Sequence, residues 1–166
     1  MAGEFLLPAF RFQVTLTQSG GGGGGQNPPV LGNGGFAECS GLELEAEIKD
    51  YPEGGRNDAV IRRVGRVKLS PIVLKRGMFS TAPTATANPE LWAWLTRMVR
   101  GELPIPRYDG RIQIMDPTLQ QPLAIWTFDR GLPQKVSGPA LNAKTGEVAI
   151  EELHIVHEGL RLGEAS

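Results

Sequence analysis

Two histidines and one cysteine are the side chains best suited to metal or nucleophilic chemistry in this sequence. His154 and His157 are three residues apart, a spacing that aligns side chains on a helix but places them on opposite faces of a strand. The string that contains them, HIVHE, has neither the HExxH nor the HxxEH spacing of zinc proteases. Cys39 could form a thiol dyad with a histidine, but no spacing supplies a group that would orient the histidine. We therefore expect no metal site and no thiol nucleophile.

The other catalytic patterns are missing or incomplete. No serine lies in a GxSxG motif, and the adjacent Glu151 and Glu152 would point to opposite faces of a strand, which is poor geometry for shared acid–base chemistry. The glycine run from Gly20 to Gly25 contains a GxGxxG string after a strand. However, neither a helix nor the Lys-Ser or Lys-Thr of a P-loop follows it. We therefore expect no enzyme activity and no cofactor.

Charged residues form two consecutive blocks of opposite sign. Seven acids lie between Glu38 and Asp58, whereas the stretch from Ala59 to Arg76 holds six basic residues and no acid. Within the acidic block, Glu43, Glu45 and Glu47 alternate with apolar residues and so share one face of a strand. This carboxylate stripe is either a solvated face or a surface turned toward a shared cavity or a basic partner. Head-to-tail contacts between copies, one block against the other, would close into rings or continue into filaments.

The composition indicates one ordinary domain that is rich in turns. A chain of 166 residues is too short for two full domains, and 22 glycines with 13 prolines argue against a helical bundle. The net charge of −1 provides no global field of the kind that marks a dedicated nucleic-acid binder. The opening residues, MAGEFLLPAF, lack the basic and apolar segments of a signal peptide. We expect a single domain over residues 1–166, made in the cytoplasm and without a membrane anchor.

Alternating polarity predicts six or seven strands, with one helix over 88–100 that has Asn88 as N-cap and Pro89 as its first residue. The alternation breaks at Pro71 and at Glu151–Glu152, so we expect a bulge, bend or edge at each. The glycine-rich residues 19–35 are expected to form a mobile loop and residues 80–87 an extended link. The fold class is therefore α+β and β-dominated, with two packed sheets or a rolled β-barrel and one flanking helix. The strands are expected at Phe10–Thr17, Leu42–Lys49, Val67–Leu74, Arg111–Asp116, Leu123–Arg130 and Glu147–Val156.

Four strings along the chain, taken together and in this order, resemble the phage tail tube protein family. They are GFAECSGLELEAEIKDYPEGG (Gly35–Gly55), VKLSPIVLKRG (Val67–Gly77), ELWAWL (Glu90–Leu95) and KVSGPALNAKTGEVAIEELHIVHEGL (Lys135–Leu160). The likeness extends from Phe10 to Leu160. The family includes the inner-tube proteins of contractile injection systems and R-type tailocins.

The resemblance implies a structural subunit, with a β-barrel-like sandwich similar to that of the type VI secretion tube protein. Six subunits would form a ring whose inner sheets join, and the rings would stack into a hollow tube. The implied partners are copies of the chain itself, a contractile sheath protein, baseplate or tube-initiator and tube-terminator proteins, and a cargo of effector protein or DNA in the lumen. Residues 19–35 and 80–87 are longer than the family pattern, so phage tail, tailocin and injection system all stay open.

Two sets of residues are candidate assembly sites. Glu43, Glu45 and Glu47 are predicted to face the lumen, where like charge would repel a polyanion. A loop over 51–66 is predicted to contact a neighbouring subunit or ring through Tyr51, Glu53, Gly54, Gly55, Arg56, Arg62, Arg63 and Arg66.

Two alternatives stay open for the function. One is a single-ring tube-initiator or baseplate protein of the same fold, and the other is a small-ligand-binding barrel with Trp92, Trp94 and Trp126 around a pocket.

Overall fold

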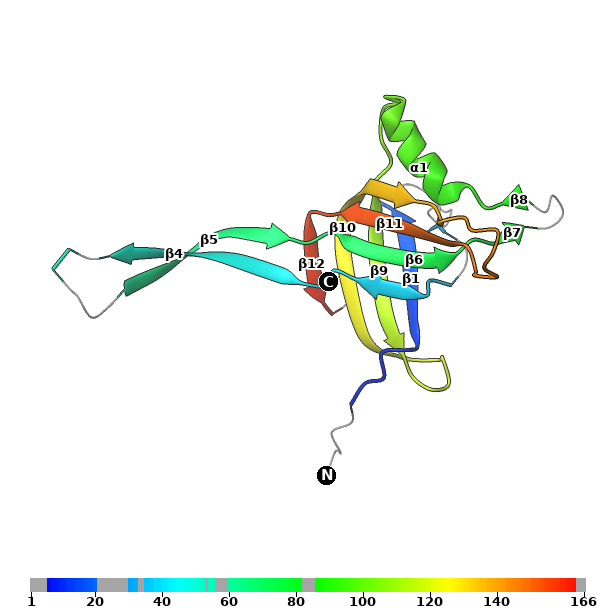
Figure 1. The fold of residues 1–166 in the computed structure, drawn as a ribbon. Coiled ribbons are helices and arrows are strands. Elements are labelled where there is room, and N and C mark those ends of the chain that lie inside the picture. The colour runs from blue at the N-terminus through cyan, green and yellow to red at the C-terminus, as the bar shows by residue number, and fades with distance from the viewer. Residues whose placement is uncertain are drawn as a thin grey trace.

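The computed structural model describes residues 6–20, 30–32, 35–52, 54–55, 60–81 and 86–163. Strands dominate this part of the chain and one helix accompanies them, which confirms the predicted fold class (Figure 1). The elements are β1 (Phe12–Gln18), β2 (Val30–Leu31), β3 (Glu38–Ser40), β4 (Leu44–Pro52), β5 (Val60–Leu69), β6 (Ile72–Gly77), β7 (Ser80–Thr81), β8 (Thr86–Ala87), α1 (Glu90–Val99), β9 (Tyr108–Met115), β10 (Pro122–Ser137), β11 (Ile150–Val156) and β12 (Gly159–Leu162).

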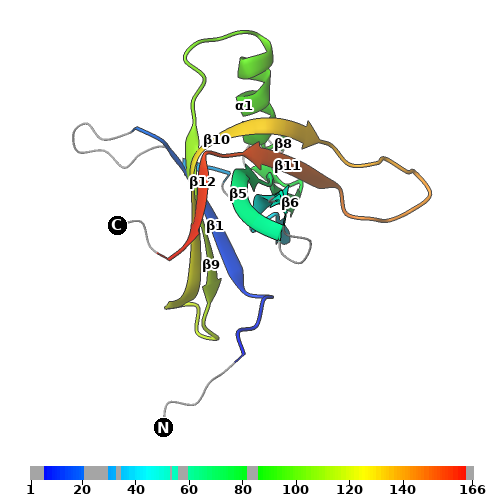
Figure 2. The ribbon, with the colours of Figure 1, turned by 90° about the vertical axis from the view of Figure 1, so that its left-hand side faces the viewer.

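Most strands belong to one antiparallel sheet that bends into two layers along β10. The front layer contains β2, β1, β9, the first part of β10 and β12, and the back layer contains the last part of β10 with β11, β6 and β3. In Figure 2 the front layer stands upright, and β6, β11 and α1 lie to one side of it. Two further pairs, β4 with β5 and β7 with β8, form separate two-stranded ribbons. No closed barrel exists within the described residues.

The bend in β10 has a local cause in its backbone. The ladder with β9 shifts register between Phe128 and Gly131, and Arg130 between them has a positive φ of 52°. At Gly131, an added Cβ would lie 2.7 Å from Ile155 Cγ2 and 2.9 Å from the Tyr108 carbonyl oxygen, so only glycine fits where the two layers meet. A second shift, between Pro133 and Lys135, interrupts the ladder with β11 shortly after that ladder begins at Leu132.

The core lies between the two layers and is closed on one side by α1. Trp94 of the helix is 2% exposed, donates its indole N–H to the Pro106 carbonyl at 2.8 Å and meets the Tyr108 ring edge-on. The helix begins at Glu90, one residue later than predicted, and the Asn88 side chain accepts the Glu90 amide at 2.9 Å. The principal buried apolar side chains of the core are Leu16, Ile112, Phe128, Ile72, Leu74, Leu153, Ile155 and Leu91.

Several strand predictions need correction. The bulge expected at Glu151–Glu152 is absent, because β11 runs in continuous register with β6 and Glu151 occupies a core position. Pro71 lies neither in a bulge nor in an edge strand but in the break between β5 and β6. The extended link over 80–87 begins and ends in two paired strands, Ser80–Thr81 and Thr86–Ala87. The mobile loop predicted over 19–35 falls largely outside the described residues.

Candidate functional site

The most unusual feature of the molecule is the hairpin of β4 and β5. Among the described strands these two pair only with each other, and Figure 1 shows them extending far from the two layers. Their register runs from Leu44 opposite Leu69 to Pro52 opposite Val60, with a bulge where Glu47 faces Gly65 and Arg66. A two-stranded ribbon without a supporting layer is marginal by itself in water. The hairpin therefore requires a partner to hold its shape.

One face of this hairpin is apolar and open to solvent. Ala46 pairs with Val67 and Ile48 with Val64, so these residues lie on the same face as Leu44. Leu44 is 59% exposed, Ile48 52%, Val67 61% and Val64 72%. The described residues of the domain do not cover this face, although its apolar side chains alternate as in a half-buried strand. A contiguous apolar surface of this kind marks an interaction site.

The opposite face of the hairpin is charged. Glu45 lies opposite Lys68, Lys49 opposite Arg63, and Glu47 shares the face. Glu43 precedes the strand and accepts a hydrogen bond from the Ser70 hydroxyl at 2.5 Å. Glu43 therefore lies where the hairpin leaves the two layers. Glu45 and Glu47 lie along the charged face of the hairpin, next to cations of β5.

The contact residues predicted in a loop lie mostly in strands. Tyr51 is in β4 with the Arg63 guanidinium 5.2 Å from its ring centroid, and Arg62 in β5 lies 3.4 Å from an Asp50 carboxylate oxygen. Arg66 also belongs to β5, so the predicted loop over 51–66 was wrong for these residues, and their role in contacts stays a prediction. The enrichment of β5 in β-branched residues (Val60, Ile61, Val64 and Val67) was the signal that could have identified the strand. Gly54 and Gly55 form the turn, while Glu53 and Arg56 lie outside the described residues.

A second surface is the outer face of the front layer, which is mainly polar, with Ile125 as an apolar member opposite Gln113. Gln13 lies opposite Gln113 and Thr15 opposite Arg111, with Arg161 of β12 at the far side. These side chains bind one another: Gln113 donates to Gln13 at 3.2 Å, and the Arg161 guanidinium makes two hydrogen bonds to Asp129, at 2.5 and 3.1 Å. Sequence reasoning noted the polar face of β1 but not its continuation across four strands.

The front layer also has two open edges within the described residues. On one side, β2 pairs only with Leu16 and Thr17, which leaves residues 12–15 of β1 without an outer neighbour. On the other side, β12 pairs with β10 alone. Unpaired strand edges expose main-chain donors and acceptors and are templates for pairing with another chain.

The residues considered for chemistry are not brought together. Burial raises the pKa of the Cys39 thiol to about 11, the opposite of what an activated nucleophile needs. His154 binds Glu152, and His157 contacts the Ser70 carbonyl oxygen at 3.0 Å. Glu151 faces the core and pairs with Arg76. In the described ranges no group of three His, Cys, Asp or Glu side chains could hold a metal ion.

The three tryptophans do not share a pocket. Trp94 borders a hollow beside α1, whereas Trp126 borders two shallow grooves on the other side of the hairpin junction, and the hollow beside α1 shares no lining residue with those grooves. Trp92 is 38% exposed and donates its indole N–H to Glu151 at 3.0 Å. The arrangement predicted for a ligand-binding barrel is therefore not formed. No helix in the described part is long and apolar enough to span a bilayer.

Solved structures with the same fold come from contractile injection particles. The chain is 23% identical to a chain in the baseplate of the anti-feeding prophage, with a TM-score of 0.74 and coverage of 98% of this chain and 97% of that one. For a chain of the PVC sheath–tube complex in its extended state, the identity is 21%, the TM-score 0.73 and the coverage 98% and 94%. A type six secretion system protein shares the fold more distantly, with 9% identity, a TM-score of 0.52 and coverage of 93% and 83%.

The comparison with protein families gives the assignment. Among curated proteins nothing matches the chain. The family model described as the T4-like virus tail tube protein gp19 matches residues 8–161, which is nearly the whole sequence. This family is structural, so its members are not enzymes. The open edges, the unsupported hairpin and the family match agree, and the chain belongs to the T4-like virus tail tube protein family.

Proposed function

We propose that this protein is the inner-tube subunit of a contractile injection system or phage-tail-like particle. Copies join side by side into rings, and the rings stack into a hollow tube through which cargo passes. The single observation that carries this proposal is that the domain is incomplete by itself. In the part of the chain that the structure describes, the front layer ends in two open edges, and no other segment covers the apolar face of the hairpin.

The two open edges of the front layer are compatible with ring closure. The order β1, β9, β10, β12 is antiparallel at every step, so β12 and β1 run in opposite directions. Rotation of a copy about a central axis preserves these directions, and β12 of one copy can therefore pair antiparallel with β1 of the next. Such a contact is heterologous, and it forms a closed ring where the rotation between successive copies closes. Closure would pair both edges and join the front layers into one continuous barrel.

The polar face of the front layer is better supported as the wall of the lumen than the stripe of Glu43, Glu45 and Glu47. It carries Asp109 and Asp129 against Arg111 and Arg161, so its charges balance. A wall with internally paired charges presents no strong field that would hold a passing cargo of protein or DNA. The lumen position of Glu43, Glu45 and Glu47 stays a prediction, because these residues belong to the hairpin segment rather than to this face.

The structural neighbours suggest the setting of the tube. They come from a six-fold symmetrised baseplate, a tube-terminating cap, a sheath–tube complex and a sheath/tube terminator. We infer that rings of this chain are hexameric and lie inside a sheath, between a baseplate or initiator and a terminator. A baseplate or initiator protein that forms only one ring is the second candidate, since one of these neighbours is a baseplate chain.

Light scattering after size-exclusion chromatography, followed by negative-stain imaging, tests the proposal. Stacked rings or tubes support a tube subunit, and single rings that do not stack support the initiator. Monomers at all concentrations, with or without a preformed baseplate, would contradict both.

The basic residues of the hairpin give a first mutational prediction. Replacing Arg62, Arg63 and Arg66 with glutamate reverses the charge of β5 without removing any core side chain, since all three are exposed. We expect a folded subunit whose assembly falls by at least about tenfold, because like charges brought together at an interface cost several kcal/mol. The measurement is the tube fraction after sedimentation, and Arg100→Glu beyond α1 is the matched control. Normal tube growth by the triple variant would rule out a role of this strand in assembly.

A further inference from the structure

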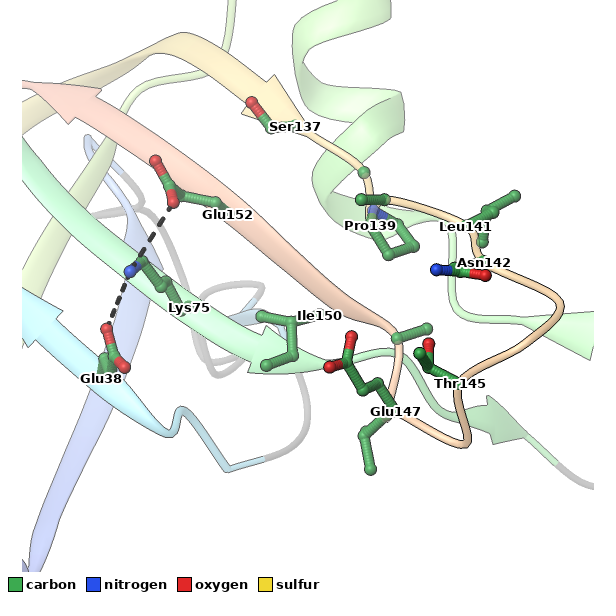
Figure 3. A pocket seen from close by; sticks show the side chains of 14 residues that line it. Glu38, Lys75, Ser137, Pro139, Leu141, Asn142, Thr145, Glu147, Ile150 and Glu152 are labelled. Atoms are coloured by element: carbon green, nitrogen blue, oxygen red, sulfur yellow. Dashed lines mark ion pairs between the residues drawn. The ribbon is translucent and has the colours of Figure 1, made fainter.

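A groove of about 430 Å³ lies on the outer face of the back layer. Its floor is made by neighbouring strands, with Glu38 of β3 opposite Lys75 of β6 and Lys75 opposite Glu152 of β11. The loop between β10 and β11, residues 138–149, curves along one side and forms the wall, as Figure 3 shows. The groove is open to solvent and receives no segment of its own domain within the described residues.

The groove combines acidic charge with exposed apolar side chains. Lys75 Nζ lies 2.9 Å from Glu38 and 3.9 Å from Glu152, and the hydrogen bond to Glu38 raises the lysine pKa. Hydrogen bonding to His154 lowers the pKa of Glu152, which favours the charged carboxylate there. Glu147 adds a third carboxylate, so the residues that line the groove include three acids and one lysine. Beside them, Leu141 is 88% exposed, Val148 73% and Ile150 47%.

The hairpin has the opposite chemistry. Strand β5 carries Arg62, Arg63, Arg66 and Lys68 and no acid, and exposed valines alternate with these cations. An apolar and basic strand is the counterpart that an apolar and acidic groove fits.

The positions of the two surfaces exclude a contact within one molecule. The hairpin joins β6 before Ile72, whereas the groove loop meets β6 at its other end, where Ile150 pairs with Gly77. Figure 1 shows the hairpin leaving the layers on one side and this loop lying on the other. A hairpin can therefore reach only the groove of another copy, and such a contact repeats head to tail.

We propose that the groove between the 138–149 loop and the back layer is the receptor for the β4–β5 hairpin of a neighbouring copy. This inference rests on the proposed function, because it specifies where one tube subunit holds the next. Arg62 lies two residues from Val64, on the apolar face of the hairpin, so Leu141, Val148 and Ile150 cover the valines while the carboxylates Glu38, Glu147 and Glu152 receive this arginine. The hairpin thereby gains the second layer that it lacks in its own molecule.

Disulfide trapping in assembled tubes tests the contact directly. Because Cys39 is the only cysteine, Cys39→Ser gives a background in which the sole thiols are introduced ones. Val64→Cys with Val148→Cys should yield a ladder of linked subunits on oxidation, visible on a denaturing gel. The control is Val64→Cys with Val99→Cys, at an equally exposed position on α1, which should stay monomeric on the gel. Tubes in which the two pairs link equally, or neither links, would overturn the inference.

A charge exchange gives a second and independent readout. Glu38→Lys with Glu147→Lys should lower assembly by at least about tenfold, and adding the three arginine-to-glutamate changes of the hairpin should restore much of it. Glu102→Lys is the control, since Glu102 pairs with Arg97 away from both surfaces. Circular dichroism verifies that each variant is folded. Undiminished tube growth by the groove variant overturns this inference alone, whereas failure of the unaltered protein to form rings or tubes overturns the proposed function as well.

Discussion

At the scale of single residues, one buried ion pair accounts for the main error in the strand prediction. The Arg76 Nε and Glu151 Oε1 atoms are 2.5 Å apart, and both side chains are only 1% exposed. Glu151 also accepts the Trp92 indole N–H at 3.0 Å, which ties α1 to the back layer. A glutamate at a core position looks like a break in the alternation, although the strand continues in register through it.

Removing one partner of this pair should destabilise the subunit strongly. Glu151→Ala leaves the Arg76 charge buried without its carboxylate, and we expect the free energy of unfolding to fall by roughly 3–5 kcal/mol. Urea denaturation followed by circular dichroism measures the change. The matched control is Glu102→Ala, which breaks the exposed pair with Arg97 and should cost less than about 1 kcal/mol. Equal losses of unfolding free energy for Glu151→Ala and Glu102→Ala would show that the buried pair does not stabilise the attachment of α1 to the back layer.

At the scale of elements, a glycine in β9 allows an aromatic side chain of β10 to pack closely against it in the front layer. Gly110 of β9 lies opposite Phe128 of β10, whose ring is fully buried. An added Cβ at Gly110 would lie 1.9 Å from the Phe128 ring. The ring therefore lies over the glycine, and this places an aromatic side chain at the centre of the core without bending β9.

Gly110→Ala should consequently disturb the packing of the core. The Phe128 ring must move away from the new methyl group, and overpacking of this kind costs about 1–3 kcal/mol. Differential scanning calorimetry should show a lower melting temperature for the isolated subunit. Gly146→Ala is the comparison, because nothing lies within 4 Å of its Cβ position. A melting temperature unchanged by Gly110→Ala would mean that the ring does not depend on the absence of a side chain there.

At the scale of the whole molecule, the open edges of the front layer matter more than any pocket. The Gly163 amide donates to the Ile125 carbonyl at 2.7 Å, across the ladder between β12 and β10. Because successive amides alternate in direction along a strand, the amide of Leu162 points to the open side. This group is available to a neighbouring copy and is not used within the subunit's own ladder.

Leu162→Pro should weaken ring formation while preserving the fold of the subunit. Proline removes the outward amide, and the loss of one hydrogen bond of about 1 kcal/mol at each junction weakens that contact roughly fivefold. The ring population at a series of protein concentrations measures the effect, with Leu162→Ala as the variant that keeps the amide. If the alanine variant assembles as poorly as the proline variant, the side chain rather than the strand edge carries the contact.

The sequence alone determined the strand-rich class, the single helix, the lack of catalytic constellations and the resemblance to tail tube proteins. These features follow from alternation, capping residues and motifs, which depend on neighbours within a few positions. Only the tertiary structure decided that Leu44, Ile48 and Val64 are exposed, that Glu151 is buried, and that the arginines of β5 lie on a projecting strand. Burial depends on which distant elements pack together, and a local pattern shows that a face is apolar without showing whether its own chain or another copy covers it.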